Sequence, residues 1–278
     1  MFKIRLCLII IGILMSGCSS KSEATESAFT LIGGRESTAG DFPASVYVTM
    51  ASGGQCSATI VGSSSLLLAG HCVAGGPVLS FVVMGNKFSA ICTRSLILGH
   101  DLALCKINKE IKGVAFENVN LDANLLKIGT EVLLTGYGCT ESNNGRGSGG
   151  NDGIFRIGEA LITKLASPFD LETNSGAAVC FGDSGGSAYF YTDASKTKRV
   201  VISTNSRGDI AAMSLITSTS SKPSIDFMKT WTVANTEKIC GFNNEAKGCR
   251  DADSQNRGAC EMAYENLNVC LKKDTLQY

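Results

Sequence analysis

The chain has 278 residues and 12 cysteines, with 25 basic and 25 acidic side chains and a hydrophobic fraction of 44%. This length allows one large domain or two small ones, and the apolar content suffices for a packed core. The balanced charge leaves no broad electrostatic footprint, so we expect neither nucleic acid nor an anionic membrane surface as a partner. No CxxC pair occurs and there are 2 histidines, so we expect disulfides in an oxidising compartment and no metal or other cofactor.

The N-terminal residues indicate export. Lys3 and Arg5 precede a short apolar run over residues 6–15, which is well below the roughly 20 residues that span a bilayer and is typical of a signal peptide. Residues 14–18, LMSGC, resemble the bacterial lipobox, in which the cysteine becomes the first mature residue and carries lipid. We therefore expect a lipoprotein signal peptide over residues 1–18, lipid on Cys18, and a polar tether or propeptide over residues 19–30. The alternative is an ordinary signal peptide that contains an incidental cysteine.

From residue 31 to residue 236, short apolar segments alternate with turn clusters rich in glycine, serine and threonine. This texture is typical of an all-β protein. Residues 143–153, rich in glycine and asparagine, predict a mobile loop, and residues 225–231 predict the start of a short helix. The predicted strands are 46–50, 79–84, 102–106, 131–137, 154–162, 187–191 and 199–205.

Residues 237–278 differ in character from the rest of the chain. They hold four cysteines among charged and amide side chains, and residues 261–271 predict a short helix. A segment this small has little core and depends on disulfides. We expect a disulfide-rich extension that caps the preceding domain; a separate recognition module is the alternative.

Ser184 lies between glycines, in the sequence GDSGG over residues 182–186. Glycines allow a sharp turn and bring backbone N–H groups close to a bound carbonyl, as acyl transfer by serine requires. The same Gly-x-Ser-x-Gly spacing occurs in the nucleophile elbow of α/β-hydrolases, whose histidine follows the serine. Here both histidines, His71 and His100, precede Ser184, so an α/β-hydrolase would lack its base.

The chain resembles the trypsin/chymotrypsin family from residue 31 to about residue 231. Residues 69–72, AGHC, resemble that family's histidine motif, and residues 56–60, CSATI, resemble the strand whose cysteine bridges to it. Residues 100–104, HDLAL, resemble the aspartate motif, and residues 180–186, CFGDSGG, resemble the serine motif. Residues 136–138, GYG, resemble a turn between them, with Tyr137 in place of the commoner tryptophan. The motifs follow one another in the family's order.

The resemblance implies a fold and a catalytic site. The fold would be all-β, with two six-stranded antiparallel β-barrels over residues 31–236 and the site at their junction. His71 would be the general base and acid, Asp101 would hold its tautomer, and Ser184 would attack a peptide carbonyl. The backbone N–H groups of Gly182 and Ser184 would form the oxyanion hole, and Ser203 would support the aspartate. His100 would neighbour this triad and not join it.

The resemblance also implies activation by proteolysis. Residues 31–34, LIGG, resemble the start of the mature family enzymes, whose new α-amino group pairs with the aspartate before the catalytic serine, here Asp183. We therefore expect a zymogen, cut between Thr30 and Leu31 by another protease. Thr30 is neither arginine nor lysine, which argues against trypsin-like self-activation. Since no cysteine other than Cys18 precedes Leu31 in the mature chain, the cut would also release the enzyme from the membrane.

The substrate pocket would have Ala178 at its floor, with Asn205 and Ser214 on its walls. No aspartate stands at the floor, so we expect preference for small or medium uncharged side chains and not for arginine or lysine.

Ten of the 12 cysteines remain once Cys7 and Cys18 are set aside. The resemblance implies a Cys56–Cys72 disulfide, and Cys92–Cys105 flanks the aspartate segment. Cys139–Cys180 is the pair left over in the protease domain. The last four cysteines are expected to pair among themselves, in an order that the sequence leaves open: Cys240, Cys249, Cys260 and Cys270.

The expected function is therefore a serine endopeptidase that acts on protein or peptide substrates. It would lie in the bacterial cell envelope, anchored through Cys18, or be secreted after cleavage. One alternative is a catalytically silent binding lipoprotein on the same fold. Another is an adhesion or structural lipoprotein, for which the only hint is the tripeptide Arg207-Gly208-Asp209.

Overall fold

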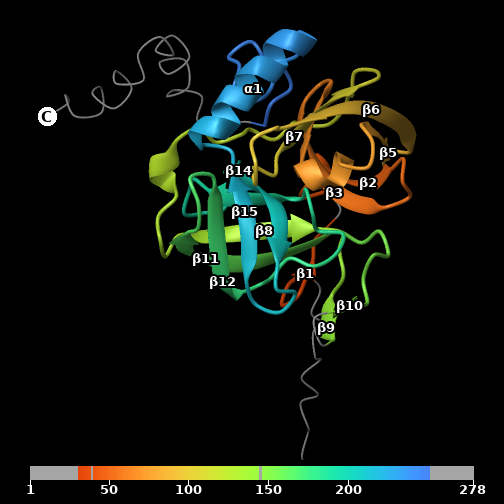
Figure 1. Ribbon diagram of the computed structural model, residues 1–278. Coiled ribbons are helices and arrows are strands. Elements are labelled where there is room, and N and C mark those ends of the chain that lie inside the picture. Colours follow the sequence, from red (N-terminus) through yellow and green to blue (C-terminus); the bar gives the residue numbers. More distant parts are fainter. Residues whose placement is uncertain (1–30, 39, 144–145, 251–278) are drawn as a thin grey trace, which may run out of the picture.

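The computed structural model describes residues 31–38, 40–143 and 146–250 and consists mostly of antiparallel strands (Figure 1). The first six-stranded unit, barrel one, closes in the order β2-β3-β4-β7-β6-β5. Its strands are β2 (Ser45–Met50), β3 (Gln55–Gly62), β4 (Ser65–Leu68), β5 (Val78–Val83), β6 (Asn86–Arg94) and β7 (Ala103–Ile107).

The second unit, barrel two, runs in the order β11-β12-β15-β14-β13-β8 and closes through pairing of β8 with β11. Its strands are β8 (Glu131–Gly136), β11 (Arg156–Leu165), β12 (Asp170–Gly176), β13 (Ser187–Tyr191), β14 (Arg199–Gly208) and β15 (Ser214–Ser218). A short β1 (Arg35–Glu36) adds to β11 at the edge. The all-β fold of two six-stranded antiparallel barrels is thus confirmed.

The predicted strands correspond to seven of these elements, and several others were not predicted. The missed strands are β4, β6, β12 and β15: β4 is a run of only four buried residues, and β6 alternates only over its middle, at Phe88, Ala90 and Cys92. The predicted loop at residues 143–153 contains part of a hairpin, formed by β9 (Glu141–Asn143) and β10 (Arg146–Ser148). The predicted helix is α1 (Lys222–Asn235), which begins where the Ser221 hydroxyl accepts a hydrogen bond from the Ser224 backbone N–H.

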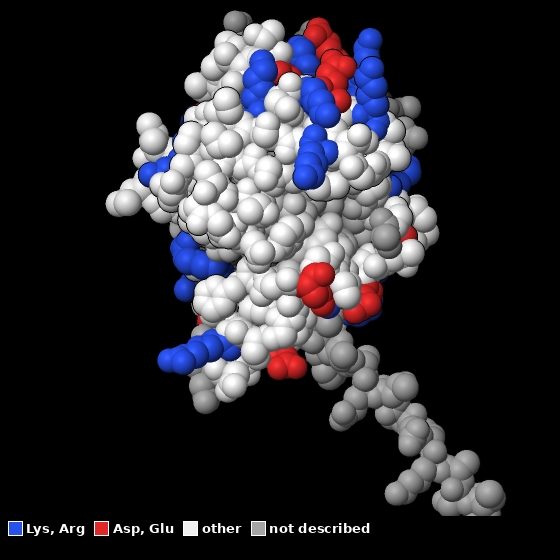
Figure 2. Space-filling model, turned by 90° about the vertical axis from the view of Figure 1, so that its right-hand side faces the viewer, with Lys and Arg blue, Asp and Glu red and all other residues white. Residues whose placement is uncertain are grey.

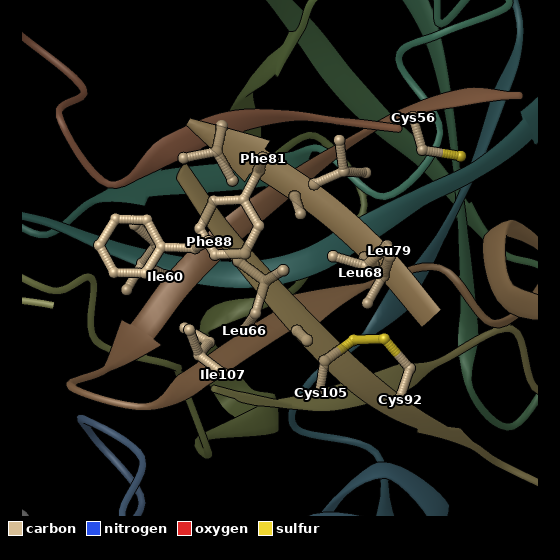
Figure 3. Close-up of a cluster of buried hydrophobic side chains, with 14 of the residues drawn as sticks. Cys56, Ile60, Leu66, Leu68, Leu79, Phe81, Phe88, Cys92, Cys105 and Ile107 are labelled. Atoms are coloured by element: carbon tan, nitrogen blue, oxygen red, sulfur yellow. A yellow bond between two sulfur atoms is a disulfide. The ribbon is translucent and has the colours of Figure 1, made fainter. Parts of the chain in front are cut away.

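Strand alternation builds the core of barrel one (Figure 3). In β5 the side chains of Leu79, Phe81 and Val83 are buried and those between them are exposed, as a strand with one face inward requires. Phe81 stacks on Phe88 of β6, with ring centroids 5.6 Å apart. Burial of such side chains supplies the main free energy that holds the barrel closed.

Three predicted disulfides are confirmed: Cys56–Cys72, Cys92–Cys105 and Cys139–Cys180. Cys92 and Cys105 stand opposite each other on β6 and β7, so their bond joins two strands that are already paired (Figure 3). Cys240 pairs with Cys249 within the C-terminal extension. Four disulfides are typical of an exported protein. The expected lipidation of Cys18, the tether, Cys260, Cys270 and the helix at 261–271 all lie outside the described residues.

Residues 237–250 pack on the connection between the two barrels. The Cys240 backbone N–H donates to the Val61 carbonyl at 2.7 Å, and Val119 N–H donates to the Cys240 carbonyl at 2.8 Å. Phe116 exchanges two further backbone bonds with this segment, at Gly248 and Arg250. This part of the extension is therefore bonded to the barrels through its backbone.

None of the helices in the described part of the chain has the length and apolar character needed to cross a bilayer. On the face shown in Figure 2, lysine and arginine side chains mix with acidic ones towards the top, and a broad uncharged band lies below them.

Candidate active site

A cleft of about 710 Å³ is lined by residues of both barrels. His71 lies just after β4 and Asp101 just before β7, so both belong to barrel one. Ser184 precedes β13 and Ser206 lies in β14, so both belong to barrel two. The three residues expected to form the triad are therefore brought to one site, although 113 positions separate the first from the last in the chain.

His71 and Asp101 form the best-defined part of the cleft. His71 lies in a 3₁₀ turn (Gly70–Val73) that the Cys56–Cys72 disulfide ties to β3. Its Nδ1 lies 2.7 Å from Asp101 Oδ2, and its backbone N–H donates to Asp101 Oδ1 at 2.7 Å. An Nδ1–H that donates to the carboxylate leaves Nε2 as a proton acceptor, which is the tautomer a general base needs.

Burial and hydrogen bonding act in opposite directions on Asp101. Burial alone raises the pKa of this carboxyl, but the hydrogen bonds and positive charge of His71, together with a bond from Ser206, hold its pKa below the ordinary value. Asp101 is therefore ionised at neutral pH and can stabilise a protonated His71.

The residue that supports Asp101 is Ser206, so the expectation for Ser203 is wrong. Ser206 Oγ donates to Asp101 Oδ2 at 2.6 Å, whereas the Ser203 hydroxyl is buried and has no hydrogen-bond partner among the described residues. The pairing of β14 with β15 shifts its register between Asn205 and Arg207, which leaves Ser206 as an extra residue. This bulge turns Ser206 towards barrel one, and a bulge leaves no mark in an alternation pattern.

Ser184 stands on the loop between β12 and β13. Its carbonyl oxygen accepts from the Ser57 N–H at 2.8 Å, and the Ser57 hydroxyl donates to the Gly182 carbonyl at 2.8 Å. Gly182 has φ +98°, a conformation that favours glycine. The N–H groups of Gly182 and Ser184 donate to no acceptor within the described part of the chain, so both are available to a ligand.

The Cys56–Cys72 disulfide lies between His71 and Ser184 and contacts both. Cys72 Sγ lies 3.9 Å from His71 Nε2 and 3.7 Å from the Ser184 carbonyl oxygen. The Ser184 hydroxyl forms no hydrogen bond with His71 among the described side chains. Catalytic hydrogen bonds are often long before substrate binds and shorten in the complex.

Asp183 is completely buried beside the nucleophile. Its Oδ1 accepts from the Gly138 N–H at 2.8 Å and its Oδ2 accepts from the Cys180 N–H at 2.8 Å. Burial raises its pKa to about 7, against the opposing effect of these two bonds and of the charge on Arg156. A Cβ on Gly138 would collide with Asp183, which explains the glycine in this turn. No cation hydrogen-bonds to Asp183 in the part of the molecule that is described.

Leu31 is also buried, in the core of barrel two. The Ala178 N–H donates to the Ile32 carbonyl at 2.8 Å, and the Gly34 N–H donates to the Leu31 carbonyl. Leu31 has φ +54°, a left-handed conformation that leucine rarely adopts. The segment expected to begin the mature enzyme is thus docked on barrel two, and no hydrogen bond joins Leu31 to Asp183 within the described structure.

The three residues expected to form the substrate pocket do not line the cleft. Ala178 is fully buried against Ile32, and Ser214 Oγ accepts from the Val179 N–H at 2.9 Å. Asn205 is fully buried, with its amide donating to the carbonyls of Thr135 and Asp183. Of these three, only Asn205 belongs to β14, where it directly precedes the bulge. The residues that line this part of the cleft are Val179, Cys180, Phe181, Arg207, Gly208 and Ile210.

His100 lies on the cleft wall but is committed to structure, as expected of a neighbour. Its Nδ1 lies 2.8 Å from Ser95 Oγ and its Nε2 lies 2.9 Å from Ser224 Oγ. Burial lowers its pKa, although the charges of Asp170 and Asp101 oppose this. His100 is therefore neutral at pH 7 and links the cleft wall to helix α1.

Cys56, His71 and Cys72 bring their side-chain donor atoms within 4.8 Å of one another, as metal ligands do. The two sulfurs form a disulfide with an S–S distance of 2.03 Å. A disulfide has no thiolate to offer a metal, so this cluster does not fit a metal site.

Two six-stranded antiparallel barrels whose shared cleft holds a hydrogen-bonded histidine–aspartate pair and a glycine-framed serine define a chymotrypsin-like protein. Comparison with family models agrees: residues 31–192 match the model described as Trypsin. The chain therefore belongs to the trypsin family. No curated protein matches the chain.

Proposed function

We propose that this protein is a serine endopeptidase that hydrolyses peptide bonds through an acyl-enzyme. The observation that carries the proposal is the His71 Nδ1 to Asp101 Oδ2 contact of 2.7 Å in the cleft that Ser184 lines. Membership of the trypsin family supports it and is consistent with protein or peptide substrates.

The proposed reaction assigns each residue one task. Ser184 Oγ attacks the peptide carbonyl carbon while His71 Nε2 takes its proton, and the N–H groups of Gly182 and Ser184 stabilise the oxyanion. The imidazolium then gives the proton to the leaving amine as the C–N bond breaks. Water, deprotonated by His71, hydrolyses the ester and restores Ser184. Asp101 holds the histidine tautomer and stabilises its charge throughout.

Covalent labelling tests this proposal. A fluorophosphonate probe should label the purified protein, and Ser184→Ala should abolish labelling. Ser52→Ala, a change at an exposed serine in the turn between β2 and β3, is the matched control and should label normally. Failure of the wild-type protein to label in any form, cut or uncut, would instead favour the silent binding protein.

We also propose that cleavage between Thr30 and Leu31 activates the enzyme. Within the described residues Asp183 is a buried carboxyl without a bonded cation, and a new α-ammonium at Leu31 would supply one. The strained φ of Leu31 supports the same step, because cleavage frees that backbone angle. N-terminal sequencing of the labelled species should find Leu31 first. Full activity with residues 19–30 still attached would contradict this.

The proposed location is the bacterial cell envelope, with lipid on Cys18 and release after the cut. Its support is the lipobox-like sequence before the protease domain. Membrane fractionation should place the uncut chain with the lipids and the cut chain in the soluble fraction. Active enzyme that begins at Leu31 and stays on membranes would contradict the release.

We propose that the enzyme prefers uncharged side chains before the cleaved bond. The cleft is lined near Ser184 by Val179, Phe181 and Ile210. Among its described lining residues the one carboxylate, Asp101, is committed to His71 and Ser206, and the nearby cation Arg207 is bonded to Ser206 and Asp170. Profiling with a peptide library measures the preference, and strong cleavage after lysine would contradict it.

A further inference from the structure

Arg207 extends the hydrogen-bonded row behind the catalytic pair. Its Nη1 donates to Ser206 Oγ at 3.1 Å, and Ser206 Oγ in turn donates to Asp101 Oδ2 at 2.6 Å. Arg207 Nη2 lies 3.4 Å from Asp170 Oδ2. The row therefore runs from Asp170 through Arg207, Ser206 and Asp101 to His71.

Arg207 determines which way the Ser206 hydroxyl points. A serine hydroxyl carries one proton and can also accept, whereas a guanidinium can only donate. With Arg207 donating to Ser206 Oγ, the proton of Ser206 is directed to Asp101 Oδ2. Without this donor the hydroxyl is free to rotate, and the carboxylate that orients His71 loses a fixed bond.

Asp170 holds the guanidinium in place. Asp170 is 3% exposed, and its other oxygen accepts from the Thr217 hydroxyl at 2.9 Å. A buried carboxylate of this kind needs a cation or several hydrogen bonds, and Arg207 supplies the cation. A forked guanidinium reaches two partners at once, which a lysine ammonium does with less geometric precision.

We infer that Arg207 is a positioning residue for the proposed hydrolysis, which acts through Ser206 on the Asp101–His71 pair and is held by Asp170. The inference rests on the proposed function. It assigns Arg207 a task that neither the triad nor the tripeptide Arg207-Gly208-Asp209 accounts for.

The test measures the second-order rate constant of fluorophosphonate labelling of Ser184, on the full chain in the form in which the wild type reacts. This small probe reports activation of the nucleophile without peptide contacts along the cleft. Arg207→Met should lower the rate constant about tenfold, the effect expected for a lost hydrogen bond to a charged group. Arg207→Lys should recover part of the loss, since an ammonium can still donate to Ser206.

Arg94→Met is the matched control. Arg94 also lines the cleft and is exposed, but it makes no hydrogen bond to Ser206, Asp101 or His71. It should leave the rate constant within about twofold of the wild type, a change too small to reflect a lost charged hydrogen bond. If Arg94→Met and Arg207→Met lower the rate constant equally, the effect is one of cleft charge and the inference is wrong.

A double-mutant cycle separates positioning from general structure. If Arg207 acts through Ser206, Arg207→Met should cause no further loss in a Ser206→Ala background. If the fold-losses of Ser206→Ala and Arg207→Met instead multiply in the double variant, the inference is overturned. An Arg207→Met rate constant equal to that of the wild type would also overturn it. If Arg207→Met folds poorly because Asp170 loses its cation, the Asp170→Asn/Arg207→Met pair removes both charges and should show the same loss. A wild type that never labels disproves the proposed function itself, a result distinct from all of these.

Discussion

The histidine–aspartate half of the candidate site lies on barrel one and the serine half lies on barrel two, and the two halves are held in different ways. His71 is fixed by two bonds to Asp101, by the Cys56–Cys72 disulfide and by a short 3₁₀ turn. Ser184 stands on a loop outside the strands, beside the buried Asp183, to which no cation is bonded among the described residues. The His71–Asp101 half is fully bonded, whereas the proposed activation would add a cation beside Asp183 in the Ser184 half.

This difference bears on the proposed activation, because it shows which half of the site a cleavage could change. The pair on barrel one depends on bonds within the folded chain and needs no further event. The loop on barrel two carries Asp183, a buried carboxyl that accepts from the Gly138 and Cys180 N–H groups and whose pKa burial raises to about 7. A regulated step is therefore expected to act on the Ser184 loop and not on His71.

The largest expected effect comes from the His71–Asp101 half, which is already fully bonded. Asp101→Asn should lower kcat about 10⁴-fold, because an amide NH₂ beside Nδ1 favours the wrong histidine tautomer. The fold should stay intact, which thermal unfolding would show. Glu110→Gln, at an exposed carboxyl on the loop after β7, is the control and should leave kcat unchanged. If Asp101→Asn and the wild type have equal activity, Asp101 does not orient His71 and the prediction is wrong.

The next effect concerns the Ser184 half of the site and is a pH-dependent change in stability. The pKa of Asp183 is raised in the folded, uncut chain from 3.8 to about 7, so the folded state holds its proton more tightly than the unfolded state does. Its contribution to stability is full below about pH 4 and is lost as the pH rises through 7, by at most about 4 kcal/mol.

Urea unfolding from pH 4 to pH 8 measures this contribution as the difference in the free energy of unfolding between the wild type and Asp183→Asn. In the uncut chain the difference should change across this range, and it should shrink once a Leu31 ammonium pairs with Asp183. The Asp183→Asn protein should also fail to gain activity after the cut. A difference that is constant with pH would show that Asp183 does not titrate in this range.

The smallest effect compares two disulfides. Chain entropy predicts that removing Cys92–Cys105 costs about 3 kcal/mol and removing Cys139–Cys180 about 4 kcal/mol, for separations of 13 and 41 residues. Cys92 and Cys105 join strands that are already paired, so alanine at both positions should lower Tm and leave kcat within about twofold. Alanine at Cys139 and Cys180 should lower kcat even at temperatures well below Tm, where the protein is still folded. The reason is that this bond ties the Ser184 loop to the β8–β9 connection. Equal loss of kcat in both variants would remove the contrast between the halves.

The motifs that could be recognised in the sequence are those in which short spacing and residue chemistry act together. His71 beside Cys72, Asp101 in its apolar segment and Ser184 among glycines each carry a local signal. The Cys56–Cys72 disulfide followed from the family resemblance, and Cys139–Cys180 was the pair left over. The strands β4, β6, β12 and β15 were not recognised, although each pairs with the strand just before it in the chain. β12 and β15 are rich in the polar residues that also fill turns, and β4 has only four residues.

The sequence by itself determined the fold class, the disulfides of the protease domain and which histidine, aspartate and serine meet. These followed from short motifs whose residues resemble those of the trypsin/chymotrypsin family, with Cys139–Cys180 as the pair left over. Only the tertiary structure decided that Ser206 and not Ser203 supports Asp101, that Asn205 is buried, and that Arg207 joins the row. All three residues lie at one bulge in β14, which depends on how two strands pair and not on the residues of either strand alone.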